Sequence, residues 1–338
     1  MSEFISSFTT GFEDIIAKTL PSVLKGADII NVYDGLVHYK YQGNQNNINK
    51  VIFFNNSFNV IKFFRGNQAN FNNMVSVASS TRSSHIKDNG TFRIRFMRGN
   101  QFEKINKQLS QIAEATITKQ TKLRLDRLNP STEFWYVIRN EGYGFYGQLL
   151  KKRSSTEKNL NKGELRPEFA YLMCSCVKLS EESVIMEPFA GFGAIPIQIK
   201  ERFSFHRLII NDIDTDKIKR LQRVFNSKDL RFCFSSNDAL NQASIEDASI
   251  DLIITDPPWG YYEEINDIAL FYRDMLQEFR RVIKEDGSIV ILSARKNEFA
   301  EAVDKTDMFG IQKTINTLVN GKKASVYILK PKNKKKRE

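Results

Sequence analysis

The tetrapeptide Asp256-Pro257-Pro258-Trp259 carries the residue types in this chain that are best suited to chemistry on a planar amine. It directly follows the apolar run at 252–255, which predicts a buried strand whose C-terminal end opens into a rigid loop. The two prolines fix the backbone and remove two N–H donors, so the carbonyls there are available as acceptors. A carboxylate, free carbonyls and a flat ring could bind the N–H groups of an amine and stack on its face. The structural alternative is an ordinary strand-to-turn corner with a buried Trp.

A second candidate segment is the glycine-containing run Glu187-Pro188-Phe189-Ala190-Gly191-Phe192-Gly193, between a predicted strand and a predicted helix. Its glycines would let the backbone approach a ligand closely, with the helix N–H groups behind them. It lacks the third glycine of the dinucleotide fingerprint. The acid before the loop also favours a cationic or hydroxyl-bearing ligand over a phosphate. Taken alone, such a loop is more often a structural turn.

The positions of both segments in the predicted fold make them more informative, because acidic residues lie at or after the ends of four successive predicted strands. Glu187 ends the first strand, Asp212 the second, Asp238 follows the third and Asp256 the fourth. An acid after the second strand commonly holds ribose hydroxyls, and a carboxylate after the third can accept from an adenine amino group. Since the C-terminal ends of parallel strands line one crevice, the four acids predict one binding site.

The elements that must position these acids begin at about residue 182, where strands and helices alternate. Strands are predicted at 184–187, 207–211, 231–235, 251–255 and 288–292, and helices at 194–202, 215–225 and 268–284. Two last strands, 312–318 and 324–329, flank Asn320-Gly321 and predict an antiparallel edge hairpin. The fold class is therefore α/β: a doubly wound, mostly parallel seven-stranded sheet with its ligand at the strand C-termini.

The first half of the chain predicts two smaller α+β regions. Residues 1–82 combine a helix at 12–24 with strands at 29–33, 36–39 and 51–54, and an Asn/Gln-rich loop at 44–49. Residues 83–152 combine a strand at 92–96 and a helix at 101–115 with strands at 122–126, 133–138 and 142–150. A linker and a helix reaching about residue 179 fill 153–181, the sheet domain covers 182–330, and 331–338 is a short basic tail.

Positive charge is concentrated in the first half of the chain. The formal net charge is +11, and residues 85–166 hold 17 Lys and Arg against eight Asp and Glu. Such a block favours attraction to phosphate groups, although a solvated basic face without a partner has the same composition. Candidate contacts to RNA are Arg93 and Arg95, on the polar face of an alternating strand, and Lys151, Lys152 and Arg153.

Composition also argues against several classes of protein. The hydrophobic fraction of 41% and the charged fraction of 26% are typical of soluble globular proteins. No apolar stretch approaches membrane-spanning length, and the N-terminus does not resemble a signal peptide, so a cytoplasmic protein without a membrane partner is expected. The three cysteines, Cys174, Cys176 and Cys233, are too few for a disulfide framework, and no metal site is predicted.

These motifs resemble those of a known family. Residues 182–330 resemble the Rossmann-like S-adenosylmethionine-dependent methyltransferase fold of the amino-methylating type, which is marked by Asp/Asn-Pro-Pro-aromatic. The segment Leu165-Arg166-Pro167-Glu168-Phe169-Ala170 resembles the one that precedes the catalytic domain in THUMP-containing RNA guanine-N2 methyltransferases. The opening Phe8-Thr9-Thr10-Gly11-Phe12-Glu13-Asp14 and the basic region 83–152 resemble the ferredoxin-like and THUMP regions of that family. Two departures are Glu187 in place of the usual Asp and Trp259 in place of Tyr or Phe.

The resemblance implies a function and a cofactor. The expected cofactor is S-adenosyl-L-methionine, bound by residues at the first three strand ends: Glu187, Pro188, Phe189, Ala190, Gly191, Gly193, Asp212 and Asp238. The expected reaction is methylation of the N2 amine of a guanosine in structured RNA, tRNA ahead of ribosomal RNA, with Asp256, Pro257, Pro258 and Trp259 as catalytic residues. Adenine-N6 or protein glutamine methylation is one alternative, and a non-catalytic RNA-binding protein on this fold is another. The target nucleotide and the oligomeric state cannot be inferred from the sequence.

Overall fold

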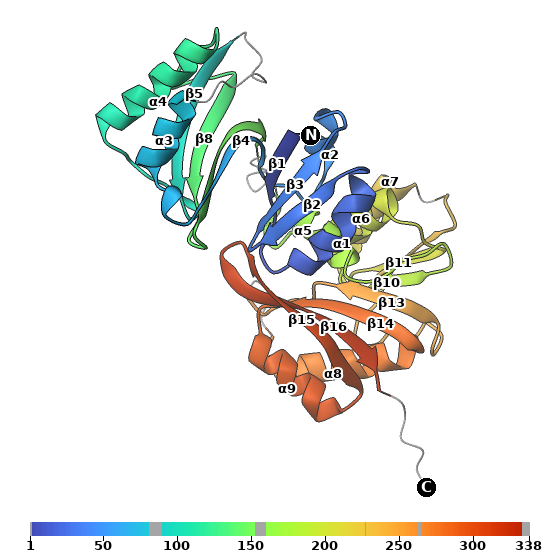
Figure 1. Ribbon diagram of the computed structural model, residues 1–338. Coiled ribbons are helices and arrows are strands. Elements are labelled where there is room, and N and C mark those ends of the chain that lie inside the picture. The colour runs from blue at the N-terminus through green and yellow to red at the C-terminus, as the bar shows by residue number, and fades with distance from the viewer. Residues whose placement is uncertain (1, 81–89, 153–159, 227, 262–264, 333–338) are drawn as a thin grey trace. The chain divides into compact units, whose positions relative to one another are not determined.

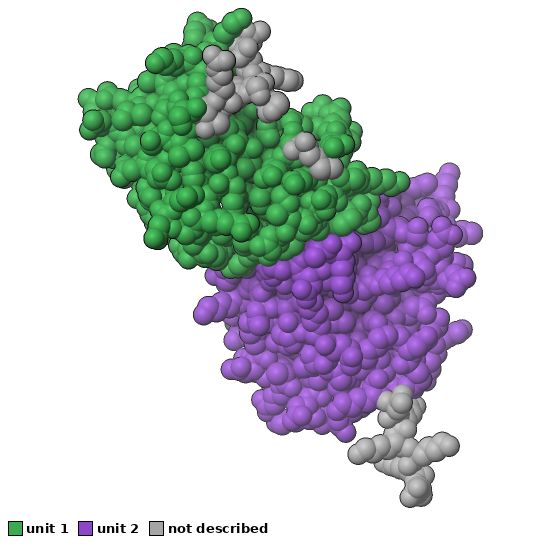
Figure 2. Space-filling model, viewed as in Figure 1, with its two compact units in different colours: residues 1–8, 20–154 green, residues 9–19, 155–338 purple. Residues whose placement is uncertain are grey.

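The computed structural model describes residues 2–80, 90–152, 160–226, 228–261 and 265–332 (Figure 1). The chain forms two compact units (Figure 2): Met1–Phe8 with Leu20–Ser154 make unit 1, and Thr9–Thr19 with Ser155–Glu338 make unit 2. Within the described residues, no helix is both long and apolar enough to span a lipid bilayer.

Unit 2 contains the seven-stranded sheet that the alternating pattern predicted. Its strands are β10 (Val184–Glu187), β11 (Arg207–Asn211), β12 (Phe232–Ser235), β13 (Ile250–Thr255), β14 (Ile283–Ser293), β15 (Phe309–Val319) and β16 (Lys322–Pro331). They lie in the order β12-β11-β10-β13-β14-β16-β15. The first five pair in parallel, and β16 pairs antiparallel with both β14 and β15. The strand order reverses between β10 and β13, which is where open α/β sheets bind ligands.

Helices cover both faces of this sheet. They are α5 (Pro167–Cys174), α6 (Ala194–Arg202), α7 (Thr215–Phe225), α8 (Ile268–Val282) and α9 (Lys296–Thr306). Figure 1 shows α8 and α9 on one face and α5, α6 and α7 on the other. The core between the sheet and α8 is fully buried and includes Met186, Ile253, Tyr272, Phe279 and Ile289. This packing buries the apolar strand runs on both faces, as expected for a mostly parallel sheet.

A segment from near the N-terminus also packs in unit 2, although the sequence grouped it with residues 1–82. We call residues 9–14 the strap. The Thr317 hydroxyl on β15 donates to the Thr10 carbonyl over 2.8 Å. The Phe12 ring contacts the Phe169 ring on α5 edge to face, with centroids 5.4 Å apart. The strap therefore connects α5 to the edge strand β15.

Unit 1 is built on a single mixed sheet. Its strands are β1 (Ser2–Ser7), β2 (Asp28–Tyr33), β3 (Leu36–Tyr41), β4 (Ser57–Arg65), β5 (Thr91–Arg98), β6 (Gln101–Phe102), β7 (Arg124–Leu125), β8 (Thr132–Ile138) and β9 (Tyr143–Lys151). They lie in the order β2-β3-β1-β4-β9-β8-β5-β6, with β7 beside β5. The pairing of β4 with β9 joins the two regions that the sequence separates at residue 82.

Helices also belong to unit 1, and two of them pack against its sheet. They are α1 (Glu13–Val23), of which only the C-terminal part belongs to this unit, α2 (Asn46–Lys50), α3 (Phe71–Ser80) and α4 (Lys107–Gln120), with a short 3-10 turn at Gly66–Gln68. Side chains from α3 and α4 pack against Phe92, Phe134 and Tyr136 of the sheet. The alternation of Phe92, Ile94 and Phe96 with Arg93 and Arg95 thus separates a buried from a polar face.

Some local predictions from the sequence were wrong. Residues 51–54 form turns rather than a strand, and Val51, Phe53 and Phe54 are apolar because they are buried. The helix expected from residue 101 begins at Lys107, because Gln101 and Phe102 pair with β5 and the Asn106 side chain caps α4 by accepting from the Leu109 N–H.

Candidate active site

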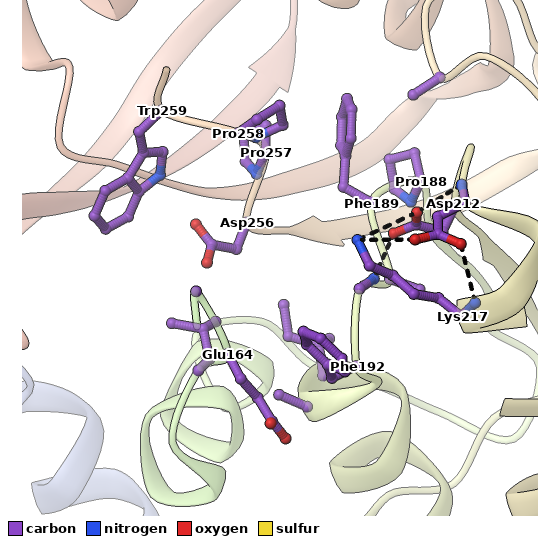
Figure 3. Close-up of a pocket in the computed structure, with 18 of the residues that line it drawn as sticks. Glu164, Pro188, Phe189, Phe192, Asp212, Lys217, Asp256, Pro257, Pro258 and Trp259 are labelled. Atoms are coloured by element: carbon purple, nitrogen blue, oxygen red, sulfur yellow. Dashed lines mark hydrogen bonds and ion pairs between the residues drawn. The ribbon is translucent and has the colours of Figure 1, made fainter. Parts of the chain in front are cut away.

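A cavity of about 520 Å³ opens at the C-terminal ends of β10, β11 and β13 (Figure 3). It brings together most of the residues that the sequence singled out: Glu187, Pro188, Phe189, Ala190, Gly191, Asp212, Asp238, Asp256, Pro257, Pro258 and Trp259. In Figure 3, Asp256 and Trp259 lie toward one end of the cavity, and Asp212 with Lys217 lie toward the other. The pattern of acids at strand ends therefore does converge on one site.

Glu187 lines this cavity and is almost fully buried, and one of its carboxylate oxygens accepts hydrogen bonds from the protein. Oε1 accepts from the Thr255 hydroxyl over 2.6 Å and from the Phe189 N–H over 2.9 Å. Oε2 is buried and has no hydrogen-bond partner among the described residues. Burial raises the pKa of Glu187 well above its usual value. A buried acceptor without a partner is costly, which points to a donor supplied by a ligand.

Asp212 fixes the glycine loop from the next strand end. Its Oδ2 accepts from the Gly191 N–H over 2.7 Å, and its Oδ1 accepts from the Asp214 N–H over 3.0 Å. Lys217 Nζ lies 3.8 Å from the same carboxylate and 5.6 Å from the centre of the Phe192 ring. These contacts hold the carboxylate rigidly at the cavity wall, and each oxygen keeps a further lone pair for a hydroxyl.

Asn211 links two loops of the site to the end of β11, and the sequence reasoning missed it. Its side-chain nitrogen donates to the carbonyls of Pro188 and Asn237 over 3.0 Å each. Its side-chain oxygen accepts from the Asn237 N–H over 2.9 Å. The available signal was an amide at the last position of a buried strand, directly before Asp212.

The remaining predicted cofactor residues differ in exposure. Asp238 is exposed at the cavity rim, where its carboxylate accepts from the Leu240 N–H over 2.9 Å. Gly193 is not among the residues that line the cavity; it is the N-cap directly before α6, with φ of 93°. A Cβ there would lie 2.4 Å from Leu221 Cδ2, so this position requires glycine for both its backbone and its packing.

Asp256 and Trp259 present polar atoms that nothing in the described chain satisfies. Asp256 Oδ1 and Trp259 Nε1 are buried without a hydrogen-bond partner among these residues. Burial raises the pKa of Asp256 to about 8, and the nearby indole N–H of Trp259 opposes part of this rise. The Trp259 carbonyl accepts from Arg295 Nε over 2.9 Å, which ties the loop to the segment between β14 and α9.

Other cavity residues were not foreseen. Among them are residues from the segment before α5 and from the adjoining ends of β15 and β16 with the turn between them: Lys162, Gly163, Glu164, Leu165, Val319, Asn320 and Lys322. These segments are distant in sequence from the strand ends, and no periodic pattern marks them as site residues. Among the described residues, no group of three or more His, Cys, Asp or Glu side chains is arranged to hold a metal ion.

The basic residues proposed for RNA lie in unit 1 and are less available than their sequence implied. Arg93 donates to Glu133 over 2.7 Å, and Lys152 Nζ lies 3.3 Å from the same carboxylate. Arg95 lies 3.8 Å from Glu133 and 5.0 Å from the centre of the exposed Phe102 ring. The Lys151 ammonium donates to the Val51 carbonyl over 2.6 Å. Arg153 lies outside the described residues.

The sheet order, the glycine loop and the acids at four strand ends define a Rossmann-like methyltransferase fold. Residues 220–325 match a family model described as the RMKL-like methyltransferase domain. The whole chain also resembles the crystal structure of TrmN from Thermus thermophilus, with a TM-score of 0.80, 16% identity and coverage of 98% of this chain and 100% of that one. The expected fold class is therefore confirmed.

Two curated relatives make the relationship more specific. One is the U6 snRNA (guanine-N(2))-methyltransferase THUMPD2 of Bos taurus, 23% identical over 191 residues, which are 55% of this chain and 36% of the relative. The other is the tRNA (guanine(10)-N2)-dimethyltransferase of Methanocaldococcus jannaschii, 27% identical over 162 residues, 44% of this chain and 43% of the relative. The chain thus spans less than half the length of these relatives. The predicted resemblance is confirmed: the chain is similar to proteins that are named as RNA guanine-N2 methyltransferases.

Proposed function

We propose that this chain transfers a methyl group from S-adenosyl-L-methionine to the exocyclic N2 amine of a guanosine in structured RNA, with tRNA favoured over ribosomal RNA. The observation that carries the proposal is the pair of buried, unpartnered polar atoms at the end of β13, Asp256 Oδ1 and Trp259 Nε1. Such atoms are rare in folded proteins unless a ligand satisfies them. The two curated relatives, both guanine-N2 methyltransferases by name, support guanine as the base.

The other end of the cavity fits the cofactor. Glu187 Oε2 offers a buried acceptor for the amino group of the methionine part. Asp212 offers its remaining lone pairs to the ribose hydroxyls, and the exposed carboxylate of Asp238 offers an acceptor to the adenine amino group. When bound, this cofactor supplies an electrophilic methyl group on a sulfonium. The residues of the protein need mainly to bring the amine in line with that methyl group.

Asp256 and Trp259 are placed to orient the amine. An exocyclic amine is a weak nucleophile because its lone pair is delocalised into the ring. Accepting its N–H groups at the Asp256 carboxylate and the Pro257 carbonyl favours the pyramidal nitrogen and stabilises the positive charge that develops on it. Trp259 provides a face on which the flipped base stacks. The proton that the amine loses is taken by Asp256, whose pKa of about 8 suits transient protonation.

The proposal predicts a pH dependence. Because the Asp256 carboxyl has a pKa of about 8, it is mostly protonated at lower pH and cannot accept both N–H groups of the amine. The kcat/KM for RNA is therefore expected to rise about tenfold per pH unit below pH 8 and to level off above it. Initial rates with a radioactive methyl donor across this range measure the profile. A flat profile between about pH 6 and pH 9 would contradict the role of Asp256.

Asp212→Ala tests cofactor binding separately from transfer. We expect the affinity for S-adenosylmethionine to fall about 10- to 100-fold, because the variant loses acceptors for hydroxyls and frees the Gly191 N–H. The matched control is Asp216→Ala on α7, which removes an exposed acid that pairs with Lys219. Calorimetry of both variants measures the affinities, and equal values would exclude Asp212 from the cofactor site.

The decisive experiment identifies the product. Purified protein is incubated with a labelled methyl donor and separate tRNA, ribosomal RNA and small nuclear RNA preparations, and the nucleosides are then analysed by mass spectrometry. N2-methylguanosine in one preparation supports the proposal and names the RNA. N6-methyladenosine instead would establish the adenine alternative. Failure of the protein to bind S-adenosylmethionine in calorimetry would favour a non-catalytic RNA-binding protein.

A further inference from the structure

The mouth of the cavity holds an aromatic residue and two basic residues. Tyr261 follows the Asp256–Trp259 loop and is 43% exposed. The Arg295 guanidinium carbon lies 4.6 Å from the centre of the Tyr261 ring, and Lys322 Nζ lies 3.6 Å from it. Two basic side chains thus contact one partly exposed ring, which concentrates positive charge beside the cavity.

This cluster is continuous with the catalytic loop. Trp259, Tyr261 and Lys322 all line the cavity that Asp256 faces. The Trp259 ring meets the Tyr261 ring edge to face, with centroids 6.2 Å apart. Arg295 donates through Nε to the Trp259 carbonyl, and its Nη1 lies 3.7 Å from Glu298. Because Arg295 donates to the Trp259 carbonyl through Nε, its Nη atoms still present donors for a ligand.

We propose that Arg295 and Lys322 form a phosphate-binding site that grips the RNA backbone beside the nucleotide whose base enters the cavity. This inference rests on the proposed function and adds the contact that places the RNA strand. A base that stacks on Trp259 leaves its own ribose and phosphates outside the pocket, close to the mouth. Each phosphate carries a negative charge, and contacts to phosphate set register without reading sequence.

Rigid elements hold both cations. Arg295 is at the junction of β14 and α9, where its backbone N–H donates to the Ser293 hydroxyl over 2.9 Å. Lys322 begins β16 directly after the turn formed by Asn320 and Gly321, and it pairs in register with Val319. A site on strand and helix ends loses less conformational entropy on binding than one on a long loop.

The two cations have different expected roles. Lys322 contributes the positive charge of its ammonium group, so its replacement should lower RNA affinity. Arg295 contributes charge and also holds the Trp259 carbonyl, which makes it a positioning residue for the stacking ring. Arg295→Lys keeps the charge but removes the fixed guanidinium contact. Its RNA affinity should therefore stay close to that of the wild type while kcat falls.

The test compares Lys322→Gln with the matched control Lys323→Gln in the full-length protein. Lys323 is the next residue of the same strand and is also exposed, but successive strand residues point to opposite faces. An unmodified tRNA transcript is the probe, and fluorescence anisotropy at several salt concentrations measures its affinity. For Lys322→Gln we expect affinity to fall about three- to tenfold and the slope of log affinity against log salt to fall by about 1. Lys323→Gln should leave both unchanged, and both variants should bind S-adenosylmethionine as the wild type does.

Equal salt slopes for Lys322→Gln and Lys323→Gln would overturn the phosphate site, even if the wild type methylates RNA. A wild-type protein that methylates no RNA would instead refute the proposed function, whatever the slopes show. For Arg295→Lys, an unchanged kcat would refute its positioning role. Loss of S-adenosylmethionine binding in Lys322→Gln would place that lysine in the cofactor site and also overturn the proposal.

Discussion

Asp256→Asn is expected to lower the rate of methyl transfer to RNA by about 100- to 1000-fold, while S-adenosylmethionine still binds within about twofold of the wild-type affinity. Asparagine has nearly the same shape and keeps one acceptor oxygen, so the loop should not rearrange. It removes the negative charge that stabilises the developing ammonium, and it cannot take the proton that the amine loses. Single-turnover rates measure the loss, and calorimetry measures cofactor binding. The control is Asp304→Asn, which changes an exposed acid on α9.

The same variant should be more stable than the wild type at high pH. The pKa of Asp256 is about 8 in the folded protein and near 3.8 when unfolded, so folding retains a proton over this window. Below about pH 4 the carboxyl is neutral in both the folded and the unfolded protein, so the free energy of unfolding is at its highest. As the pH rises toward 8, the unfolded chain loses this proton while the folded protein keeps it, and the free energy of unfolding falls. Each pH unit in this window costs the wild type up to about 1.4 kcal/mol, and Asn avoids the cost. The difference in unfolding free energy between the two proteins should therefore grow by a few kcal/mol from about pH 4 to pH 8.

Urea unfolding at about pH 5 and pH 9 measures this difference. A difference that stays constant with pH would mean that the Asp256 carboxyl is not held neutral in the folded protein, and the pH dependence proposed for catalysis would fail with it. Loss of activity together with a gain in alkaline stability is the expected signature of a carboxylate kept in an unfavourable place for catalysis.

Much of the site could be predicted from the sequence because many of its residues lie at the ends of strands that the sequence pattern reveals. The strands at 184–187 and 207–211 and the helices at 194–202 and 215–225 have the predicted bounds. Short apolar strand runs alternate there with helical segments, of which 215–225 is strongly amphipathic. Each acid sits at or near the end of its strand, so predicting the strand also placed Glu187, Asp212 and Asp256. Sequence alone could thus predict that these three acids converge.

Contacts made over long sequence distances could not be predicted in this way. Lys322 is far from Tyr261 along the chain, and Arg295 meets the Trp259 carbonyl only because β14 pairs with β13. The sequence pattern places Arg93 on a polar strand face, but in the structure Arg93 forms an ion pair with Glu133 on the neighbouring strand. Strand pairing decides such partners, and a periodic pattern carries no information about register between strands.

Gly11→Ala is expected to lower the free energy of unfolding by about 3 kcal/mol, a large loss for one methyl group. Gly11 has φ of 93°, and a Cβ there would lie 2.1 Å from the Asn316 carbonyl oxygen on β15. The oxygen belongs to the backbone of a paired strand, so it cannot move aside cheaply. Alanine would therefore push the strap from the edge of the sheet and weaken the hydrogen bond from Thr317 to Thr10.

Gly26→Ala separates the steric clash from the backbone strain. Gly26 has a similar φ of 86°, but nothing lies within 4 Å of the position its Cβ would take. We expect this control to cost only about 1 kcal/mol, the penalty of the left-handed conformation itself. Chemical unfolding measures both variants, and hydrogen exchange along β15 should show faster opening in Gly11→Ala alone. Equal losses in the two variants would show that the strap does not depend on its contact with Asn316. A larger loss in Gly11→Ala would show that residues 9–14 are held in unit 2 by their contact with β15, the strand that leads to the turn before Lys322.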